Sequence, residues 1–115
     1  MEVKMPIIKI YLPKIDTIKN ELMFKKIEDA IINIKEMEIS DKNIIVMLCL
    51  ENICQNQKLI LVEISILKNP KRTPQVRNNL IQSITQIISN HFNLKTEGVI
   101  KMVENDWGFS VCCNQ

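Results

Sequence analysis

Apolar and polar side chains alternate along some stretches of the chain, and in others the apolar ones recur every third or fourth position. The first alternating stretch covers residues 7–12, where Ile8 and Ile10 fall on one side and Lys9 and Tyr11 on the other. An alternation with a period of two residues is typical of a β-strand with one buried face. The pattern therefore predicts a strand over residues 7–12.

The following segment has the period of a helix. Beginning at Ile18, apolar side chains are spaced three and four residues apart, which predicts an amphipathic helix that ends near residues 35–37. Asp16 or Thr17 is expected to cap its first turn. The apolar stripe consists of Leu22, Met23, Ile27, Ala30, Ile31 and Ile34.

Two further strands are expected in the middle of the chain. Residues 43–50 are almost wholly apolar, which is typical of a strand buried on both faces. Residues 59–67 alternate instead, with Val62 and Ile64 interleaved with Glu63 and Ser65. The pattern predicts a second strand with one buried face.

The clearest helix signal follows the loop "KNPKRTP". Thr73 occupies a capping position, and Pro74 the first helical position, where its missing N–H is harmless. Asn93 is expected to end the helix in a left-handed conformation. A last strand is predicted over residues 99–103, followed by a short extension at residues 106–111. The helical stripe consists of Val76, Leu80, Ile81, Ile84, Ile87 and Ile88.

The predicted order is strand, helix, strand, and then the same three again. The halves superpose at an offset of about 57 residues, which places Met23 on Leu80 and Ile27 on Ile84. We therefore expect a single α+β domain spanning residues 1–115, built from βαβ units at residues 6–50 and 59–111. Parallel strands around each helix would form a four-stranded mixed sheet with both helices on one face. Its other face is expected to be apolar and to drive self-association.

Length and composition support this interpretation. The chain has 115 residues, of which 46% are hydrophobic and 24% charged, as in a globular domain with a real core. No apolar run is long enough to span a bilayer, so no membrane partner and a cytoplasmic location are expected. The spacing of the cysteines fits neither a disulfide framework nor a zinc site, and we expect reduced thiols and no metal. These cysteines are Cys49, Cys54, Cys112 and Cys113.

Charge changes the picture only locally. The net charge is +2, too small to indicate a nucleic-acid partner, but Lys68, Lys71, Arg72 and Arg77 are close together in the sequence. Positive side chains at a helix start oppose the helix dipole, which favours an anionic partner there. His91, near the end of the same helix, is expected to have a packing or capping role.

The segments "MPIIKIYL", "VEISILKNPKRTPQVRNNLIQSITQII" and "VIKMVENDWGFS" stand in this order along the chain. All three resemble the tautomerase superfamily, which includes 4-oxalocrotonate tautomerase, carboxymethyl-hydroxymuconate isomerase, malonate semialdehyde decarboxylase and macrophage migration inhibitory factor. The first is "MPIIKIYL", which is similar to the opening strand of the family. The second is "VEISILKNPKRTPQVRNNLIQSITQII", similar to the strand, arginine-bearing turn and helix of the second half. The third is "VIKMVENDWGFS", similar to a late strand. The resemblance covers residues 5 to about 110, and these three segments carry it.

The resemblance implies a homotrimeric tautomerase or isomerase that acts on a small enolisable keto or hydroxy-dienoate carboxylate. Pro6 would be the catalytic base, through a free ring nitrogen, and Arg72 would hold the carboxylate and stabilise the enolate. No cofactor or metal is implied. Further substrate contacts are expected from Arg77, Lys71, Trp107 and Phe109.

The sequence departs from the family's pattern in three ways, and the first is that it lacks the terminal Gly-Gly. Pro6 follows Met5, so its nitrogen is basic only if translation starts at Met5 or cleavage exposes it. Lys71 stands before Arg72 where the family has glycine. One alternative is therefore a catalytically silent binding or assembly protein with the same fold. A third is a ferredoxin-like RNA-binding module, although only 4% of the residues are aromatic.

Overall fold

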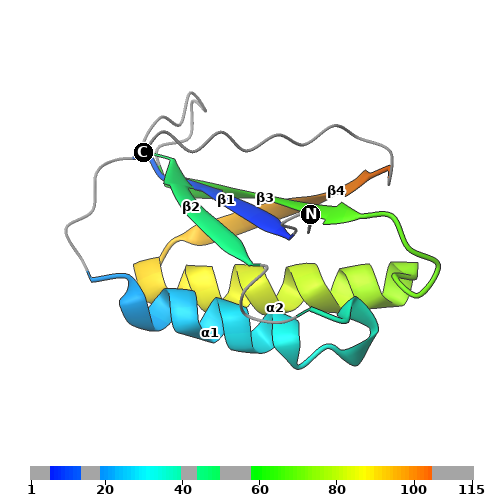
Figure 1. Ribbon diagram of the computed structural model, residues 1–115. Coiled ribbons are helices and arrows are strands. Elements are labelled where there is room, and N and C mark those ends of the chain that lie inside the picture. The colour runs from blue at the N-terminus through cyan, green and yellow to red at the C-terminus, as the bar shows by residue number, and fades with distance from the viewer. Residues whose placement is uncertain (1–5, 14–18, 40–43, 50–57, 105–115) are drawn as a thin grey trace, which may run out of the picture.

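The structure is a computed structural model, and it describes residues 6–13, 19–39, 44–49 and 58–104. Within these ranges a layer of strands lies over a layer of two helices (Figure 1). Both helices cover the same face of the sheet, as the sequence predicts. The elements are β1 (Ile7–Tyr11), α1 (Glu21–Ile32), the short 3-10 helix η1 (Lys35–Met37), β2 (Ile45–Cys49), β3 (Leu59–Leu67), α2 (Pro74–Phe92) and β4 (Lys95–Val103).

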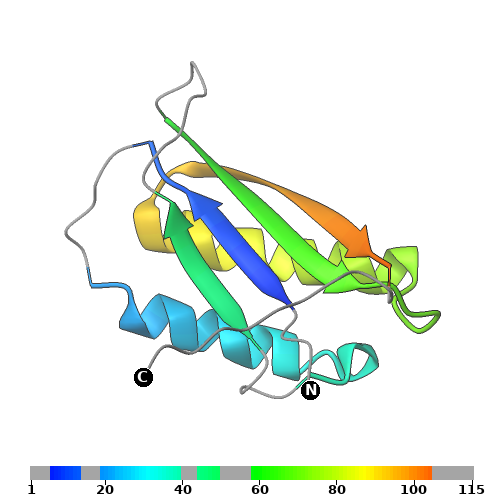
Figure 2. The ribbon, with the colours of Figure 1, turned by 45° about the horizontal axis from the view of Figure 1, so that its top comes forward.

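The strand order across the sheet is β2-β1-β3-β4 (Figure 2). β1 pairs with β2 and β3 pairs with β4 in parallel, while β1 and β3 are antiparallel neighbours. This confirms the predicted mixed sheet of two βαβ units. In a ferredoxin-like fold each βαβ unit is split by an intervening strand. Here the parallel strands are direct neighbours, so the ferredoxin-like alternative is wrong.

The two helices bury equivalent residues against the sheet. The buried residues of α1 match those of α2 at the predicted offset of about 57 residues. The buried residues of β1 match those of β3 only at an even offset, because side chains alternate along a strand. The connection between strand and helix therefore differs in length by one residue between the two units. The buried residues are Met23, Ile27 and Ile31 in α1, with Leu80, Ile84 and Ile88 among those in α2.

The core lies between the sheet and the helices. Ile8 and Ile10 of β1 are fully buried, as are Ile60 and Ile64 of β3. Gly98 lies on the same face of β4, where a Cβ atom would come within 2.9 Å of the side chains of Ile81 and Thr85. A glycine at this position thus allows α2 to pack closely on β4.

The beginning of α2 and its end agree with the sequence prediction. Thr73 caps the helix by accepting a hydrogen bond from the Val76 N–H, and Pro74 is the first helical residue. Asn93 ends the helix with a φ of 54°. β3 also has the predicted bounds.

Other boundaries differ from the prediction. α1 begins at Glu21 after Asn20, whose side chain makes no capping bond. The predicted start at Ile18 was therefore too early, and the expected caps Asp16 and Thr17 lie outside the described residues. β4 begins at Lys95 because it pairs with β3 along its whole length, from the Leu59 pair onward. The extension at residues 106–111 also lies outside the described residues.

The prediction for β2 was wrong in one respect. β2 lies at an edge of the sheet, and Met47 is 45% exposed, so the strand is not buried on both faces. Its apolar composition reflects one face on the core and a second on the open side of the sheet. A short apolar run does not distinguish the two situations.

The open face of the sheet is mixed rather than uniformly apolar. Lys9, Glu63 and Ser65 point to this side by the strand alternation, and Glu63 forms an ion pair of 3.3 Å with Lys101. Apolar side chains remain exposed near its edges, including Val99 at 53%. Within the described residues, no helix has the length and apolar character needed to cross a membrane.

Candidate functional site

Most of the residues predicted to form the site come together where the strands start or end, at one end of the sheet. We call this end the sheet edge, as distinct from the edge strands β2 and β4. β1 and β2 start at this edge, whereas β3 and β4, which run the opposite way, end there. The loop after β3 leads from the same edge into α2. The topology therefore places Pro6 and the arginine-bearing loop at one end of the sheet.

Pro6 directly precedes β1 and is buried. Its carbonyl accepts a hydrogen bond of 3.1 Å from the Ile45 N–H, which ties it to the start of β2. The register pairs Ile7 with Ser65, and continued by one residue it brings Pro6 alongside the end of β3. Strand pairing on both sides thus fixes the position of Pro6.

The loop between β3 and α2 is held by its own hydrogen bonds. The Asn69 side chain accepts from the Lys71 N–H at 2.9 Å, and the Asn69 carbonyl accepts from the Arg72 N–H at 2.9 Å. The Lys68 N–H donates to the Val103 carbonyl at 2.7 Å. Asparagine commonly closes turns in this way, so the sequence "KNPKRTP" encodes its own turn.

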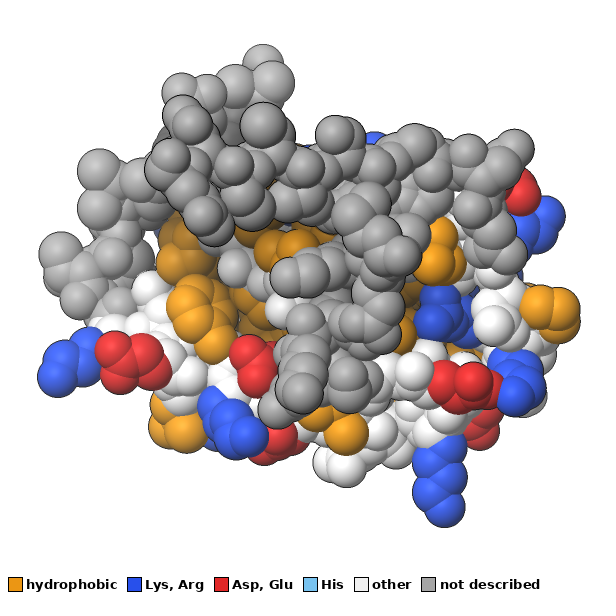
Figure 3. Space-filling view, viewed as in Figure 1, with side chains coloured by type: hydrophobic (Ala, Val, Ile, Leu, Met, Phe, Trp, Pro, Cys, Tyr) orange, Lys and Arg blue, Asp and Glu red, His pale blue; other side chains and the backbone are white. Residues whose placement is uncertain are grey.

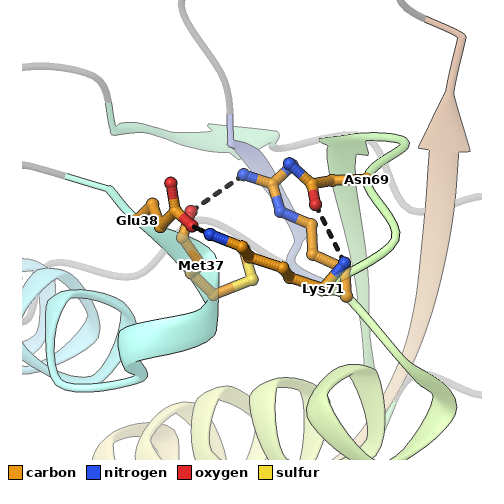
Figure 4. A network of polar contacts seen from close by, with 5 residues as sticks. Met37, Glu38, Asn69 and Lys71 are labelled. Atoms are coloured by element: carbon orange, nitrogen blue, oxygen red, sulfur yellow. Dashed lines mark hydrogen bonds and ion pairs between the residues drawn. The ribbon is translucent and has the colours of Figure 1, made fainter.

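Arg72 is the one charged residue in the described core, with 8% of its surface exposed. One terminal nitrogen of its guanidinium donates to the Leu67 carbonyl and the other to the Met37 carbonyl at 2.9 Å. Figure 4 shows the contact with Met37 at the end of η1. We call these contacts the arginine bridge, because they join the loop after β3 to the segment that follows α1. The Nε atom of Arg72 is buried and has no hydrogen-bond partner among the described residues.

Burial lowers the pKa of Arg72 below its ordinary value, and the nearby Glu38 carboxylate opposes this effect. Glu38 itself pairs with the Lys71 ammonium (Figure 4). The Lys71 hydrogen bond and then its charge lower the pKa of Glu38. Glu38 has a φ of 53°, a left-handed conformation uncommon for a residue other than glycine. This turn presents the Met37 carbonyl to Arg72 and the Glu38 side chain to Lys71.

A groove of about 350 Å³ lies at the start of α2 and is here called the α2 groove. Arg77, which is half-buried, donates from one terminal nitrogen to the Arg72 carbonyl at 2.8 Å. Lys68 at the rim forms an exposed ion pair of 3.5 Å with Glu104. The lining residues are Lys68, Asn69, Pro70, Arg72, Thr73, Pro74, Arg77 and Met102.

The structure thus brings only part of the predicted site together. Arg72 and Arg77 share the α2 groove, while Lys71 points instead to Glu38. Pro6 lies at the same edge of the sheet but does not line the groove. Trp107 and Phe109 lie outside the described residues.

Sequence reasoning missed the contribution of Met37 and Glu38. A main-chain carbonyl that accepts a bond from a distant arginine leaves no mark on the residue type. The left-handed turn at Glu38 has no glycine or asparagine to reveal it. Only the spatial approach of η1 to the loop after β3 shows this part of the site.

Described residues also line two hollows away from this site. One, of about 250 Å³, lies on the sheet and is lined in part by Tyr11, Leu61 and Val99. The other lies between the helices, where His91 Nε2 is 3.0 Å from Asn20 Oδ1. The His91 ring also contacts Phe92 edge to face. These contacts agree with the packing role expected for His91.

The described residues give no indication of a metal site or of a surface for polyanions. No three of their histidine, cysteine, aspartate and glutamate side chains cluster to hold a metal ion. Cys49 is a free, half-buried thiol, and the other cysteines lie outside the described residues. On the face in Figure 3, acidic and basic side chains lie next to one another over the helices. A nucleic-acid surface is typically basic throughout.

Comparison with known proteins adds structural relatives and no sequence relatives. No protein-family model matches the chain, and no curated protein matches its sequence. A fused 4-OT designated F6, wild type and an asymmetric trimer, is 17% identical with a TM-score of 0.75, over 90% of this chain and 92% of that one. Pt0534 inactivated by 2-oxo-3-pentynoate is 15% identical with a TM-score of 0.69, over 91% and 93%.

The macrophage migration inhibitory factor of Toxoplasma gondii is similar as well. It is 10% identical with a TM-score of 0.64, over 90% of this chain and 96% of that one. At such low identity these likenesses show the fold alone. The chain thus has the fold of the 4-OT and macrophage migration inhibitory factor structures, as the sequence resemblance implies.

Proposed function

We propose that the protein is a tautomerase that moves a proton between oxygen and carbon of a small enolisable carboxylate. The observation that carries this proposal is the sheet edge, where Pro6 lies at the start of β1 and two guanidinium groups follow the end of β3. The fold is shared with 4-OT structures, which supports the same interpretation.

The proposed chemistry needs few groups. The free ring nitrogen of Pro6 takes the proton from the substrate enol and returns it to carbon. Apolar surroundings and nearby cations lower the pKa of an amine, so that a useful fraction is neutral near pH 7. A cationic side chain of the α2 groove holds the substrate carboxylate and stabilises charge that develops on the neighbouring oxygen.

We also propose a homotrimer. Fused 4-OT structures are described as trimers, and the exposed apolar side chains Met47 and Val99 lie on the edge strands. Burial of such side chains against other copies is favourable. Sedimentation equilibrium is expected to give the mass of three chains, and a single-chain mass at micromolar concentration would exclude the trimer.

Turnover of 2-hydroxymuconate by two matched forms tests the activity. One form begins at Pro6, and the other retains Met5 before it. We expect turnover by the first and a loss of at least a hundredfold in the second, because acylation removes the basicity of the proline nitrogen. Equal turnover by both forms, or none by either, would exclude Pro6 as the base.

One observation favours a second candidate function, a catalytically silent binding or assembly protein. Both terminal nitrogens of Arg72 already donate to main-chain carbonyls. This guanidinium is then not available to hold a substrate or to stabilise an enolate. Binding of a small carboxylate without turnover by the form that begins at Pro6 would support this alternative.

A further inference from the structure

We infer that Arg77 is the side chain that contacts a bound carboxylate in the α2 groove, whereas Arg72 is a positioning residue that acts through Arg77. The inference rests on the proposed function in one respect, because it takes a small carboxylate as the ligand. It does not depend on turnover. It divides between two residues a role that the sequence assigned mainly to Arg72.

The arginine bridge argues against direct contact by Arg72. Its terminal nitrogens satisfy the carbonyls of Leu67 and Met37, and only 8% of the residue is exposed. Moving the guanidinium to a ligand would withdraw both bonds, and a buried carbonyl without a donor is unfavourable. The orphaned Nε is also buried, so it does not reach the groove surface. Arg72 is therefore already committed to the main chain.

Arg77 is in the opposite situation. It is half-buried in the same groove, and its one hydrogen bond from the guanidinium to a described residue is to the Arg72 carbonyl. None of the ion pairs between described residues includes it. Its planar group therefore keeps donors in the fork geometry that matches a carboxylate.

At the start of α2, a bound carboxylate would be contacted by a side chain rather than by the main chain. Pro74 has no N–H, and Thr73 already accepts the Val76 N–H. Few main-chain donors remain for an anion at this helix start. The positive charge of Arg77 in the first turn opposes the helix dipole, and a bound carboxylate would relieve that opposition.

The two arginines are coupled through the main chain. The Arg72 carbonyl accepts the Arg77 guanidinium bond at 2.8 Å, and the Arg72 side chain is fixed at Leu67 and Met37. The arginine bridge thus holds the carbonyl that orients Arg77. Loss of the bridge would weaken ligand binding only through Arg77.

A double-mutant cycle in the full chain tests this division of roles. The readouts are the affinity for fumarate, a carboxylate that cannot enolise, by NMR titration, and the midpoint of thermal unfolding. We expect Arg77→Gln to weaken fumarate binding at least tenfold and to leave the midpoint nearly unchanged. Arg72→Gln should lower the midpoint by several degrees, and it should weaken binding no further in the Arg77→Gln background.

Two additional variants complete the experiment. Lys26→Gln removes a positive charge from the surface of α1 and should change neither readout. Arg72→Lys keeps the charge but not the two-carbonyl geometry, so it should lower the midpoint and weaken binding through Arg77, with no further loss in the Arg77→Gln background. It serves as the folded comparison if Arg72→Gln does not fold.

Four results would overturn the inference. The first is an unchanged midpoint in both Arg72 variants, and the second is full affinity in Arg77→Gln. The third is a further loss of binding when an Arg72 substitution is added to Arg77→Gln, which would show direct contact by Arg72. Absence of fumarate binding in the unmodified chain would overturn it as well. Absence of 2-hydroxymuconate turnover with fumarate binding intact would count only against the tautomerase proposal.

Discussion

Single residues at the sheet edge show how few positions determine the candidate site. Arg72 supplies the bonds that connect η1 to the loop after β3, and Glu38 and Lys71 add an exposed ion pair over the same junction. The ion pair is solvated and contributes little at ordinary salt concentration. The buried guanidinium is therefore the stronger of the two connections.

The pH dependence of the Glu38 ion pair can be predicted from the direction of its pKa shift. The pKa of Glu38 is lowered from 4.5 in the folded chain by Lys71, so the unfolded chain binds a proton first as the pH falls. The contribution is complete at neutral pH and is lost as the pH falls below 4.5. The unfolding midpoint of Glu38→Gln should therefore lie slightly below that of the unmodified chain at pH 7 and converge with it near pH 3.

Glu36→Gln is the matched control for this measurement. Glu36 is exposed in η1 and forms none of the ion pairs between described residues. Glu36→Gln should have the same unfolding midpoint as the unmodified chain at pH 7. A gap for Glu38→Gln that persists at pH 3, or that is insensitive to salt at pH 7, would contradict the electrostatic explanation.

At the scale of elements, the sequence predicts those parts that are determined locally. α2 has its cap, proline and left-handed end in the expected places because each depends on a residue type within the helix or beside it. The start of β4 was missed because residues 95–98 become a strand only through pairing with β3. The hydrogen bond between Arg72 and the Met37 carbonyl could not be predicted for the same reason, because it joins residues far apart in the sequence.

The contact between α2 and β4 depends on Gly98. A Cβ atom at this position would come within 2.9 Å of Ile81 and Thr85 side-chain atoms, closer than atoms normally pack. Gly98→Val should therefore lower the free energy of unfolding by about 1–3 kcal/mol, the usual range for overpacking. Chemical denaturation would measure this change.

A second substitution in β4 provides the control. Glu97 is exposed on the opposite face and makes only a solvated ion pair with Lys95, so Glu97→Thr places a branched side chain away from the helix and should change stability by less than about 0.5 kcal/mol. A Gly98→Val variant as stable as the unmodified chain would show that α2 and β4 can separate slightly without loss.

At the scale of the whole molecule, the fold unites two βαβ units around the antiparallel pair of β1 and β3. This pairing places the beginning of the first unit next to the arginine-bearing loop of the second. The sequence predicts both units and their resemblance to tautomerases. It does not show that Arg77 lines the α2 groove whereas Pro6 does not. That difference depends on how the ends of the strands pack.

In the proposed mechanism, the nitrogen of Pro6 is the reactive group at this sheet edge. Pt0534, which has the same fold, is inactivated by 2-oxo-3-pentynoate, and an amine can add to the alkyne of this compound. The most direct test is to treat the form that begins at Pro6 with this compound and to locate the adduct by peptide mass spectrometry. We predict one adduct per chain on Pro6 and none on Pro6 in the form that retains Met5. An unmodified Pro6 in the first form, with labelling confined to cysteines or absent, would contradict the account.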